Sequence, residues 1–401
     1  MRSIDFENLE SVLLDAILKG AGLQEMFDGV YSCLKLPLIC FDTTFHMLAY
    51  AFPRPFYYSN WEEIAAQGSA SESVIVENNY LEYQEKMYEH GRSQLFDSGT
   101  CEGYPQACGP VMAGGRLAAY CGIMVEDCLT GDALKANDLL ARASARLIQD
   151  RYRAERGGAV ERLLINNESG PAEAESLSGA LPPPYAFVIF SAEGRGVSTL
   201  EYIRGRLCGA DGGAVGCLAG EERLYMLLGG LSRPGEIKER LKQLNGIARL
   251  YGVRAGTSDI FEPLEEMSER RGQALLALSA GGEGPVNTFR AKYPVIVARC
   301  AVGRYGREAS SLPALKALGE LDCGSDCEYM RTLRLYLKNF RRPAATAEAM
   351  GLHRNTVINR IRKIEELLGA DLADADTAAA FQLGLELREL AGGGEGGHGH
   401  G

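Results

Sequence analysis

Arginine, asparagine and lysine side chains gather in one short stretch near the carboxyl end of the chain, GLHRNTVINRIRKIEELLG (residues 351–369). The wider segment 331–363 carries nine basic side chains against the single acid Glu348, a local net charge of +8, although the whole chain has a formal net charge of −11. A surface that neutralises phosphates releases condensed counterions, so clustered arginine and lysine are the expected footprint of a nucleic-acid site. Because most charged runs are only solvated faces, the arrangement of these residues must show whether they form a nucleic-acid site.

Helical geometry sorts this stretch into two faces. At about 100° per residue, Val357, Ile361, Ile364 and Leu368 fall on one narrow apolar stripe. Asparagine can read adenine bidentately and arginine can read guanine. The opposite side carries the hydrogen-bonding side chains Asn355, Thr356, Asn359, Arg362 and Lys363.

The preceding residues, TAEAMGLHRNT, predict a short helix over 344–350, a tight turn at Gly351 and a new helix that starts near His353. Leu352 is available to pack between the two helices. This order is the helix-turn-helix signature, in which the second helix lies in the major groove of duplex DNA. The sequence therefore predicts a double-stranded DNA operator as the partner of this region.

The text from DCEYMRTLRLYLKNF to the run AATAEAMGLHRNTVINRIRKIEELLGADLADADTAAAFQLGLELREL resembles the carboxyl-terminal helix-turn-helix of the PucR/CdaR class of bacterial transcription regulators, which control purine catabolism and sugar-diacid use. The resemblance covers about residues 323–390. It implies that the recognition helix opens at His353, and that two arginines before Pro343 add contacts to the DNA backbone. The implied DNA-binding set is Arg341, Arg342, His353, Arg354, Asn355, Thr356, Asn359, Arg360, Arg362 and Lys363.

The elements that position this site begin with an amino-terminal segment to about residue 155. A helical pattern opens it, two β-hairpins follow (LPLICFDTTFHMLAYAF and GPVMAGGRLAAYCGIMVED), and a long exit helix over 131–153 ends it. The hairpins resemble those of GAF/PAS-type sensors. An aromatic group is a candidate pocket for a small-molecule effector, although aromatic residues at this spacing are more often ordinary core. The group consists of Phe52, Phe56, Tyr57, Tyr58 and Trp61.

The middle segment, 156–290, has the strand and helix order β-α-β-β-α-β of a ferredoxin-like domain, followed by a further helix predicted over 262–279. The text AGTSDIFEPLEEMSERRGQALLAL (255–278) resembles the degenerate GGDEF-like relative of diguanylate cyclases found in this regulator class. A working cyclase needs a Gly-Gly-acidic-acidic-Phe turn, whereas the hairpin here turns at Gly220-Glu221-Glu222. A structural or signal-relaying role is therefore expected; the alternative is a domain that binds nucleotide without turnover.

No catalytic, metal or cofactor site is expected. The chain has no G-x-S-x-G and no GxxxxGK[ST] motif, which argues against an enzyme. Its 11 cysteines are odd in number and scattered, which indicates mostly buried free thiols. Cys323-x3-Cys327 lacks a second ligand pair, and His398 and His400 lie in a glycine-rich tail. A pure protein-interaction module would explain the helices but not the basic face.

The expected fold class is multidomain α+β. The expected domains are a GAF/PAS-like α/β sensor with its exit helix (1–155), a GGDEF-like domain (156–290), a connector (291–322), an all-α PucR-type helix-turn-helix domain (323–391) and a flexible Gly/His tail (392–401). The opening residues lack the basic region of a secretory signal and no apolar run approaches the ~20 residues of a membrane span, so a cytoplasmic protein without membrane contact is expected.

Together these features predict a ligand-responsive, sequence-specific regulator of metabolic or catabolic genes that acts as a homodimer or higher homo-oligomer. Exit helices that pair along their Leu140/Leu147 side could couple two sensors, with Gly157-Gly158 as a hinge. The alternative is that the exit helix only covers its own sheet.

Overall fold

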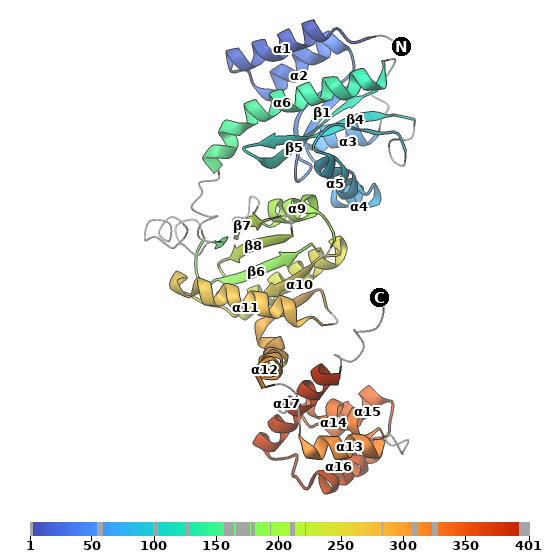
Figure 1. Cartoon of the computed structure of the whole chain (residues 1–401), viewed down its shortest axis with the longest axis vertical. Helices are drawn as coiled ribbons and strands as arrows, with labels where there is room; N and C mark the ends of the chain where they lie inside the picture. Colours follow the sequence, from blue (N-terminus) through green and yellow to red (C-terminus); the bar gives the residue numbers. More distant parts are fainter. Residues whose placement is uncertain are drawn as a thin grey trace. The chain divides into compact units, whose positions relative to one another are not determined.

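The computed structural model describes residues 3–53, 59–98, 101, 103–125, 128–155, 164–165, 177, 181–192, 194–208, 213–220, 222–282, 284–305, 312–322 and 328–392. Internal contacts divide the chain into two compact units, Met1–Leu278 with Gly282–Val286 and Ser279–Gly281 with Asn287–Gly401. The first unit mixes helices with two five-stranded sheets, whereas the second is almost entirely helical (Figure 1). The predicted combination of a mixed α/β region with a carboxyl-terminal all-helical region is thus confirmed.

The first sheet has the strand order β2-β1-β5-β4-β3, and its neighbouring strands are antiparallel. Both predicted hairpins are present. The glycines at the tip of the second hairpin, Gly114 and Gly115, have φ values of 59° and 77°, a conformation that tight two-residue turns require and that glycine adopts without strain. The strands are β1 (Leu38–Asp42), β2 (Met47–Ala51), β3 (Gln94–Phe96), β4 (Gln106–Ala113) and β5 (Arg116–Met124).

Two layers of helices enclose this sheet. α1 (Phe6–Lys19), α2 (Leu23–Leu34) and α6 (Thr130–Glu155) share a core with one face, to which strand residues such as Leu38 and Cys121 point. The alternate strand residues, such as Ile39 and Tyr120, point to the other face. On that side lie α3 (Ser59–Gln67), α4 (Glu72–Glu77) and α5 (Tyr80–His90).

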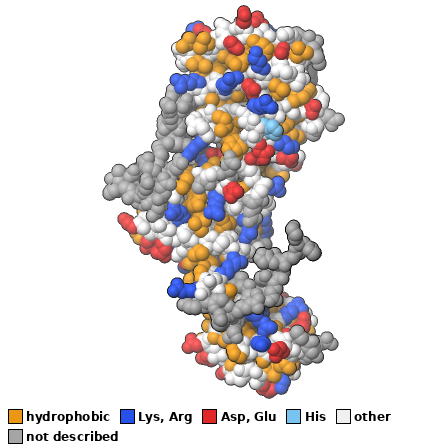
Figure 2. Space-filling model, in the orientation of Figure 1, with side chains coloured by type: hydrophobic (Ala, Val, Ile, Leu, Met, Phe, Trp, Pro, Cys, Tyr) orange, Lys and Arg blue, Asp and Glu red, His pale blue; other side chains and the backbone are white. Residues whose placement is uncertain are grey.

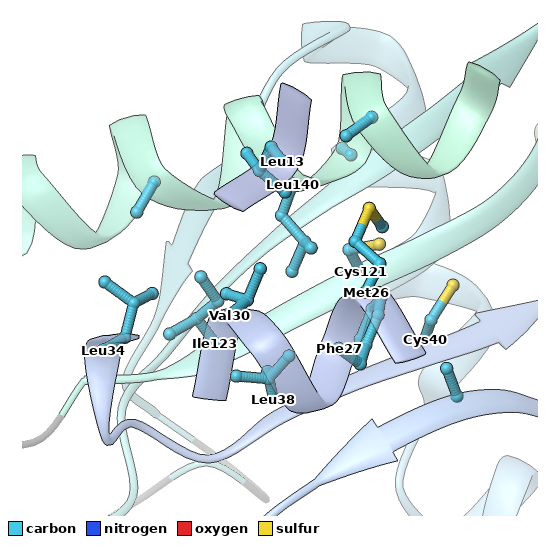
Figure 3. Packing of buried hydrophobic residues seen from close by; sticks show 14 of the residues in the cluster. Leu13, Met26, Phe27, Val30, Leu34, Leu38, Cys40, Cys121, Ile123 and Leu140 are labelled. Atoms are coloured by element: carbon cyan, nitrogen blue, oxygen red, sulfur yellow. The ribbon is translucent and has the colours of Figure 1, made fainter. Parts of the chain in front are cut away.

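The long helix α6 confirms the predicted exit helix, but its apolar side is occupied. Leu140 is completely buried, and Figure 3 shows it among Leu13, Val30 and Ile123 from α1, α2 and the sheet. Leu147 packs against the same core. This side of α6 therefore covers its own sheet, which is the alternative expectation for this helix, and Leu140 is not available for pairing two exit helices. Gly157-Gly158 lie outside the described residues.

Buried thiols belong to these cores, as predicted for most of the cysteines. Cys40 and Cys121 lie inside the core shown in Figure 3. A hydrogen bond with Cys121, together with burial, holds the pKa of the Cys40 thiol well above its ordinary value. Burial likewise raises the pKa of the Cys108 thiol. The Cys40 and Cys108 thiols are therefore neutral at physiological pH.

The second sheet of the first unit has the strand order β10-β9-β6-β8-β7. β6 pairs antiparallel with both β8 and β9, and β7 pairs antiparallel with β8. The elements are β6 (Ala186–Ser191), α9 (Val197–Leu207), β7 (Ala214–Ala219), β8 (Arg223–Leu228), α10 (Pro234–Tyr251), β9 (Arg254–Thr257), α11 (Met267–Ala280) and β10 (Val286–Thr288). Val188 and Phe190 of β6 face a core that includes residues of α9 and α10, whereas Phe187 and Ile189 face a core that includes residues of α11.

The helix predicted over 262–279 starts later than expected. A short 3-10 turn (Leu264–Glu266) precedes α11, which begins at Met267. Pro263 has an extended backbone, and a proline disfavours the helical conformation in the residue before it. The helical conformation therefore cannot include Glu262.

Leu140→Ala should lower the free energy of unfolding by about 2–5 kcal/mol, because it removes a fully buried side chain and leaves a cavity between helix and sheet. Arg142→Ala, an exposed change in the same helix, is the matched control and should shift stability by less than about 0.5 kcal/mol. Chemical denaturation followed by circular dichroism measures both. A Leu140→Ala protein that keeps its stability but changes its sedimentation would instead make Leu140 an intersubunit contact.

Candidate nucleic-acid interface

The second unit builds its carboxyl-terminal part around one apolar core. α13 (Pro313–Asp322), α14 (Tyr329–Lys338), α15 (Pro343–Met350), α16 (Arg354–Leu368) and α17 (Ala375–Gly392) contribute to it, and α12 (Phe289–Tyr305) packs against α17. Leu315 and Leu318 of α13 are buried in this core, although the sequence places them in a connector. The helical core thus reaches further upstream than the recognisable motif.

The turn between α15 and α16 has the geometry that its sequence predicts. Pro343 occupies the first turn of α15, where a missing N–H costs nothing. Gly351 ends the helix with φ 66°, and its N–H donates to the carbonyl of Glu348. The N–H of Leu352 donates to the Ala347 carbonyl at 2.9 Å, which completes a Schellman cap, while the Leu352 side chain packs on the core. The cap fixes where α16 begins.

His353 caps the start of α16: its backbone is extended and its Nδ1 accepts a hydrogen bond from the Asn355 N–H at 3.2 Å. Val357, Ile361 and Ile364 are buried in the core, so the predicted apolar stripe is confirmed. Burial of this stripe determines the rotation of α16 about its own axis.

The opposite side of α16 is exposed to solvent. Asn355, Asn359 and Arg362, spaced four and three residues apart, lie along one line of the helix. We call the exposed predicted residues of this region the recognition face: His353, Arg354, Asn355, Thr356, Asn359, Arg362 and Lys363. The face combines cations with amides, which can donate to and accept from base edges.

Two of the predicted DNA-binding arginines are engaged inside the protein. Arg360 has only 18% of its side chain exposed; its Nη1 lies 3.3 Å from Thr332 Oγ1 and 3.7 Å from a carboxylate oxygen of Glu328. Arg341 donates to the backbone carbonyls of Leu372 (3.2 Å) and Ala373 (2.7 Å). Both guanidinium groups therefore hold α16 and the chain after it against the rest of the domain.

The other predicted DNA-binding cations, Arg342, Arg354, Arg362 and Lys363, are exposed to solvent. Arg342, directly before α15, is exposed. The Lys363 ammonium lies 3.0 Å from the Glu366 carboxylate, and this hydrogen bond raises the pKa of Lys363. A hydrogen bond from Arg331 lowers the pKa of Glu328, which stays ionised beside Arg360. Exposed pairs of this kind are weak, so a phosphate can compete for Lys363.

Residues 329–387 match the PucR C-terminal helix-turn-helix domain family. This region is a PucR-type helix-turn-helix domain. Curated relatives agree: the transcriptional activator PmfR of Paenarthrobacter nicotinovorans is 32% identical over 137 residues, which are 33% of this chain and 28% of the relative. The purine catabolism regulatory protein of Bacillus subtilis is 40% identical over 65 residues, which are 16% of this chain and 12% of the relative. The predicted resemblance to PucR/CdaR-type regulators is confirmed.

The carbohydrate diacid regulator of Escherichia coli is 37% identical over 59 residues, 15% of either chain. The chain thus covers less than a third of the length of each of these relatives. Among solved structures, a regulator of polyketide synthase expression from Bifidobacterium adolescentis shares 18% identity over 58% of this chain and 96% of that chain, with a TM-score of 0.26.

On the face shown in Figure 2, acidic and basic side chains are interspersed over the amino-terminal helices. Across the described residues, no group of three or more His, Cys, Asp or Glu side chains could hold a metal ion, and no helix is long and apolar enough to cross a membrane. Cys323, Cys327, His398 and His400 lie outside those residues.

Only part of the predicted effector pocket is described. Trp61 is buried and lines a cavity of about 80 Å³ in the amino-terminal domain, between the sheet and α5. Phe52 packs against Trp61 with ring centroids 6.3 Å apart. Phe56, Tyr57 and Tyr58 lie outside the described residues.

The sequence prediction missed the polar groups of this cavity, Gln84 on α5 and Gln106 on β4. A signal for Gln84 exists, because Tyr80, Gln84 and Met87 share one helical face and a glutamine there breaks an otherwise apolar pattern. Gln106 sits on a strand whose neighbours are buried on both faces, and alternation does not single it out.

Arg360→Ala and Arg362→Ala separate an arginine with internal contacts from an exposed arginine of the recognition face. Arg360→Ala should lower the stability of the folded domain by about 1–2 kcal/mol, because it removes hydrogen-bonded contacts between α16 and α14. Arg362→Ala, exposed two residues away, should leave stability within about 0.5 kcal/mol. Thermal unfolding of both variants tests this. Equal unfolding temperatures would show that the Arg360 contacts contribute no stability.

Proposed function

We propose that this protein is a sequence-specific DNA-binding transcription regulator that controls metabolic or catabolic genes in response to a small molecule. The observation that carries the proposal is the recognition face, exposed on the second helix of a PucR-type helix-turn-helix domain. Its relatives are named as regulators of purine catabolism and of carbohydrate diacids and as a proline-responsive activator. A basic, amide-rich helix beside a capped glycine turn has the chemistry that the major groove requires.

The basic and amide side chains of this region have three different roles within this proposal. Arg354, Asn355 and Asn359, near the start of α16, read base edges, because the early residues of a recognition helix reach deepest into the groove. Arg342, Arg362 and Lys363 bind phosphates and set the register. Arg341 and Arg360, with their internal contacts, act by positioning α16.

A homodimer or higher oligomer is the form in which we expect the protein to act. Paired helix-turn-helix domains bind two half-sites about one helical turn of DNA apart, so a two-fold protein reads a two-fold operator. The occupied side of α6 directs the search for the oligomer contact to other surfaces.

The first unit is the proposed sensory part, in a cytoplasmic protein. A GAF/PAS-like sensor is supported by the five-stranded antiparallel sheet with helices on both faces. A ferredoxin-like, GGDEF-like middle domain is supported by the strand order β9-β6-β8-β7 and its antiparallel pairings. The turn between β7 and β8, which passes through Gly220 and Glu222, lacks the metal-holding sequence of a cyclase.

Asn355→Ala should weaken operator binding by ~1–3 kcal/mol and relax specificity at one base position, because it removes a bidentate base contact. Arg342→Ala should weaken binding to all duplexes alike and flatten the salt dependence, because it removes one phosphate contact. Fluorescence anisotropy with the operator, single-base variants of it and random duplex, each at several salt concentrations, measures both effects.

The operator used in these measurements is identified among genomic fragments that the purified protein selects. Glu386→Ala, a change outside the recognition face in α17, serves as the matched control and should bind like the parent. If Asn355→Ala and Arg342→Ala also bind all duplexes like the parent, α16 is not the recognition helix.

The purified chain should form no cyclic dinucleotide from GTP, because the β7–β8 turn cannot hold substrate and metal. Chromatography of a reaction with GTP and Mg²⁺ tests this, with an active diguanylate cyclase as positive control. Turnover that disappears in the double variant Glu221→Ala/Glu222→Ala would contradict the expectation.

A further inference from the structure

The cavity beside Trp61 has walls of unusually uniform chemistry. None of its described lining residues carries a formal charge. Burial raises the pKa of the Tyr120 hydroxyl, so this group stays protonated at neutral pH. An ionised ligand here would lose its hydration without gaining a counter-charge, which is strongly unfavourable. The walls therefore select an uncharged molecule.

Aromatic rings and a sheet surface define the shape of the cavity. Phe45 and Tyr80 stack with centroids 5.6 Å apart, and Phe96 meets Tyr83 edge-on at 5.0 Å. At about 80 Å³, the cavity has room for two or three water-sized groups, so it admits at most a single small ring. A flat, largely apolar ligand matches these walls.

Gln84 supplies an unsatisfied pair of polar atoms. Its side chain is 2% exposed, and neither its amide oxygen nor its amide nitrogen has a hydrogen-bond partner among the described residues. Buried polar groups are nearly always paired, so such a group needs an explanation. By contrast, Gln106 on the facing strand accepts a hydrogen bond from the Cys108 thiol at 3.7 Å.

We propose that this cavity binds a small uncharged ring whose edge presents an adjacent N–H and C=O, as in a cyclic amide, with the Gln84 side chain pairing to both. A primary amide offers one acceptor and one donor side by side, so a cis-amide edge satisfies both with two parallel hydrogen bonds. This inference rests on the proposed sensory role of the first unit and deepens it by naming the ligand class.

Trp61 provides a reporter of this site. It is the only tryptophan of the chain, and it lines the cavity. The intrinsic tryptophan fluorescence of the full-length protein therefore reports on the cavity in the absence of DNA.

The test titrates the full chain with four probes: 2-pyridone, N-methyl-2-pyridone, toluene and benzoate. 2-Pyridone should give a saturable fluorescence change. N-Methyl-2-pyridone, which lacks the donor, should bind at least tenfold more weakly, and benzoate should not bind. Gln84→Leu should weaken the binding of 2-pyridone at least tenfold and leave the affinity for toluene unchanged. Gln67→Leu, an exposed glutamine of the same domain, should behave like the parent in every titration.

Equal affinities for 2-pyridone and its N-methyl derivative would overturn the proposal, and this comparison needs no variant to fold. Saturable binding of benzoate, or no response to any probe, would also overturn it; in the latter case the Gln84 amide pairs with water only. Anisotropy with the operator is measured in parallel. If the protein binds duplex but not 2-pyridone, only the ligand inference is contradicted. If it binds 2-pyridone but no duplex, only the proposed function is contradicted.

Discussion

The burial of three side chains on α16, Val357, Ile361 and Ile364, is the constraint on which the DNA-facing surface depends. Each contributes about 1.5–3 kcal/mol of apolar burial against the helices that precede α16. Turning the helix by a single residue, about 100°, would expose this stripe and bury polar side chains in its place. The presentation of Asn355, Asn359 and Arg362 is therefore a consequence of core packing, fixed before any DNA arrives.

Local patterns predicted the elements of the fold well, because each depends on short-range chemistry. The Gly351 cap, the Gly114-Gly115 hairpin and the apolar stripe of α16 all follow from residues within a few positions of one another. Two expectations missed, each for its own reason. The apolar side of α6 could face either its own sheet or another helix, and periodicity does not name the partner. The start of α11 moved because Pro263 outweighs the apolar pattern around it.

The candidate site shows the same division. The exposed members of the recognition face follow from the helical period, but the fates of Arg341 and Arg360 do not. Their partners, the Leu372 and Ala373 carbonyls and the Thr332 hydroxyl, lie about 30 residues away along the chain. A long side chain reaches whatever the tertiary fold brings near it. Formal charge therefore overstates the number of cations free to meet phosphate.

The unpartnered amide of Gln84 has a consequence for the lifetime of the protein. A buried amide without partners costs about 1–3 kcal/mol, so the domain around it is less stable than its core would allow. Local opening of α5 would expose this amide to water and recover part of that cost, and proteases act on such open forms. A molecule that satisfies this amide would restore that stability and slow degradation. The cellular amount of the protein would then rise with the concentration of that molecule.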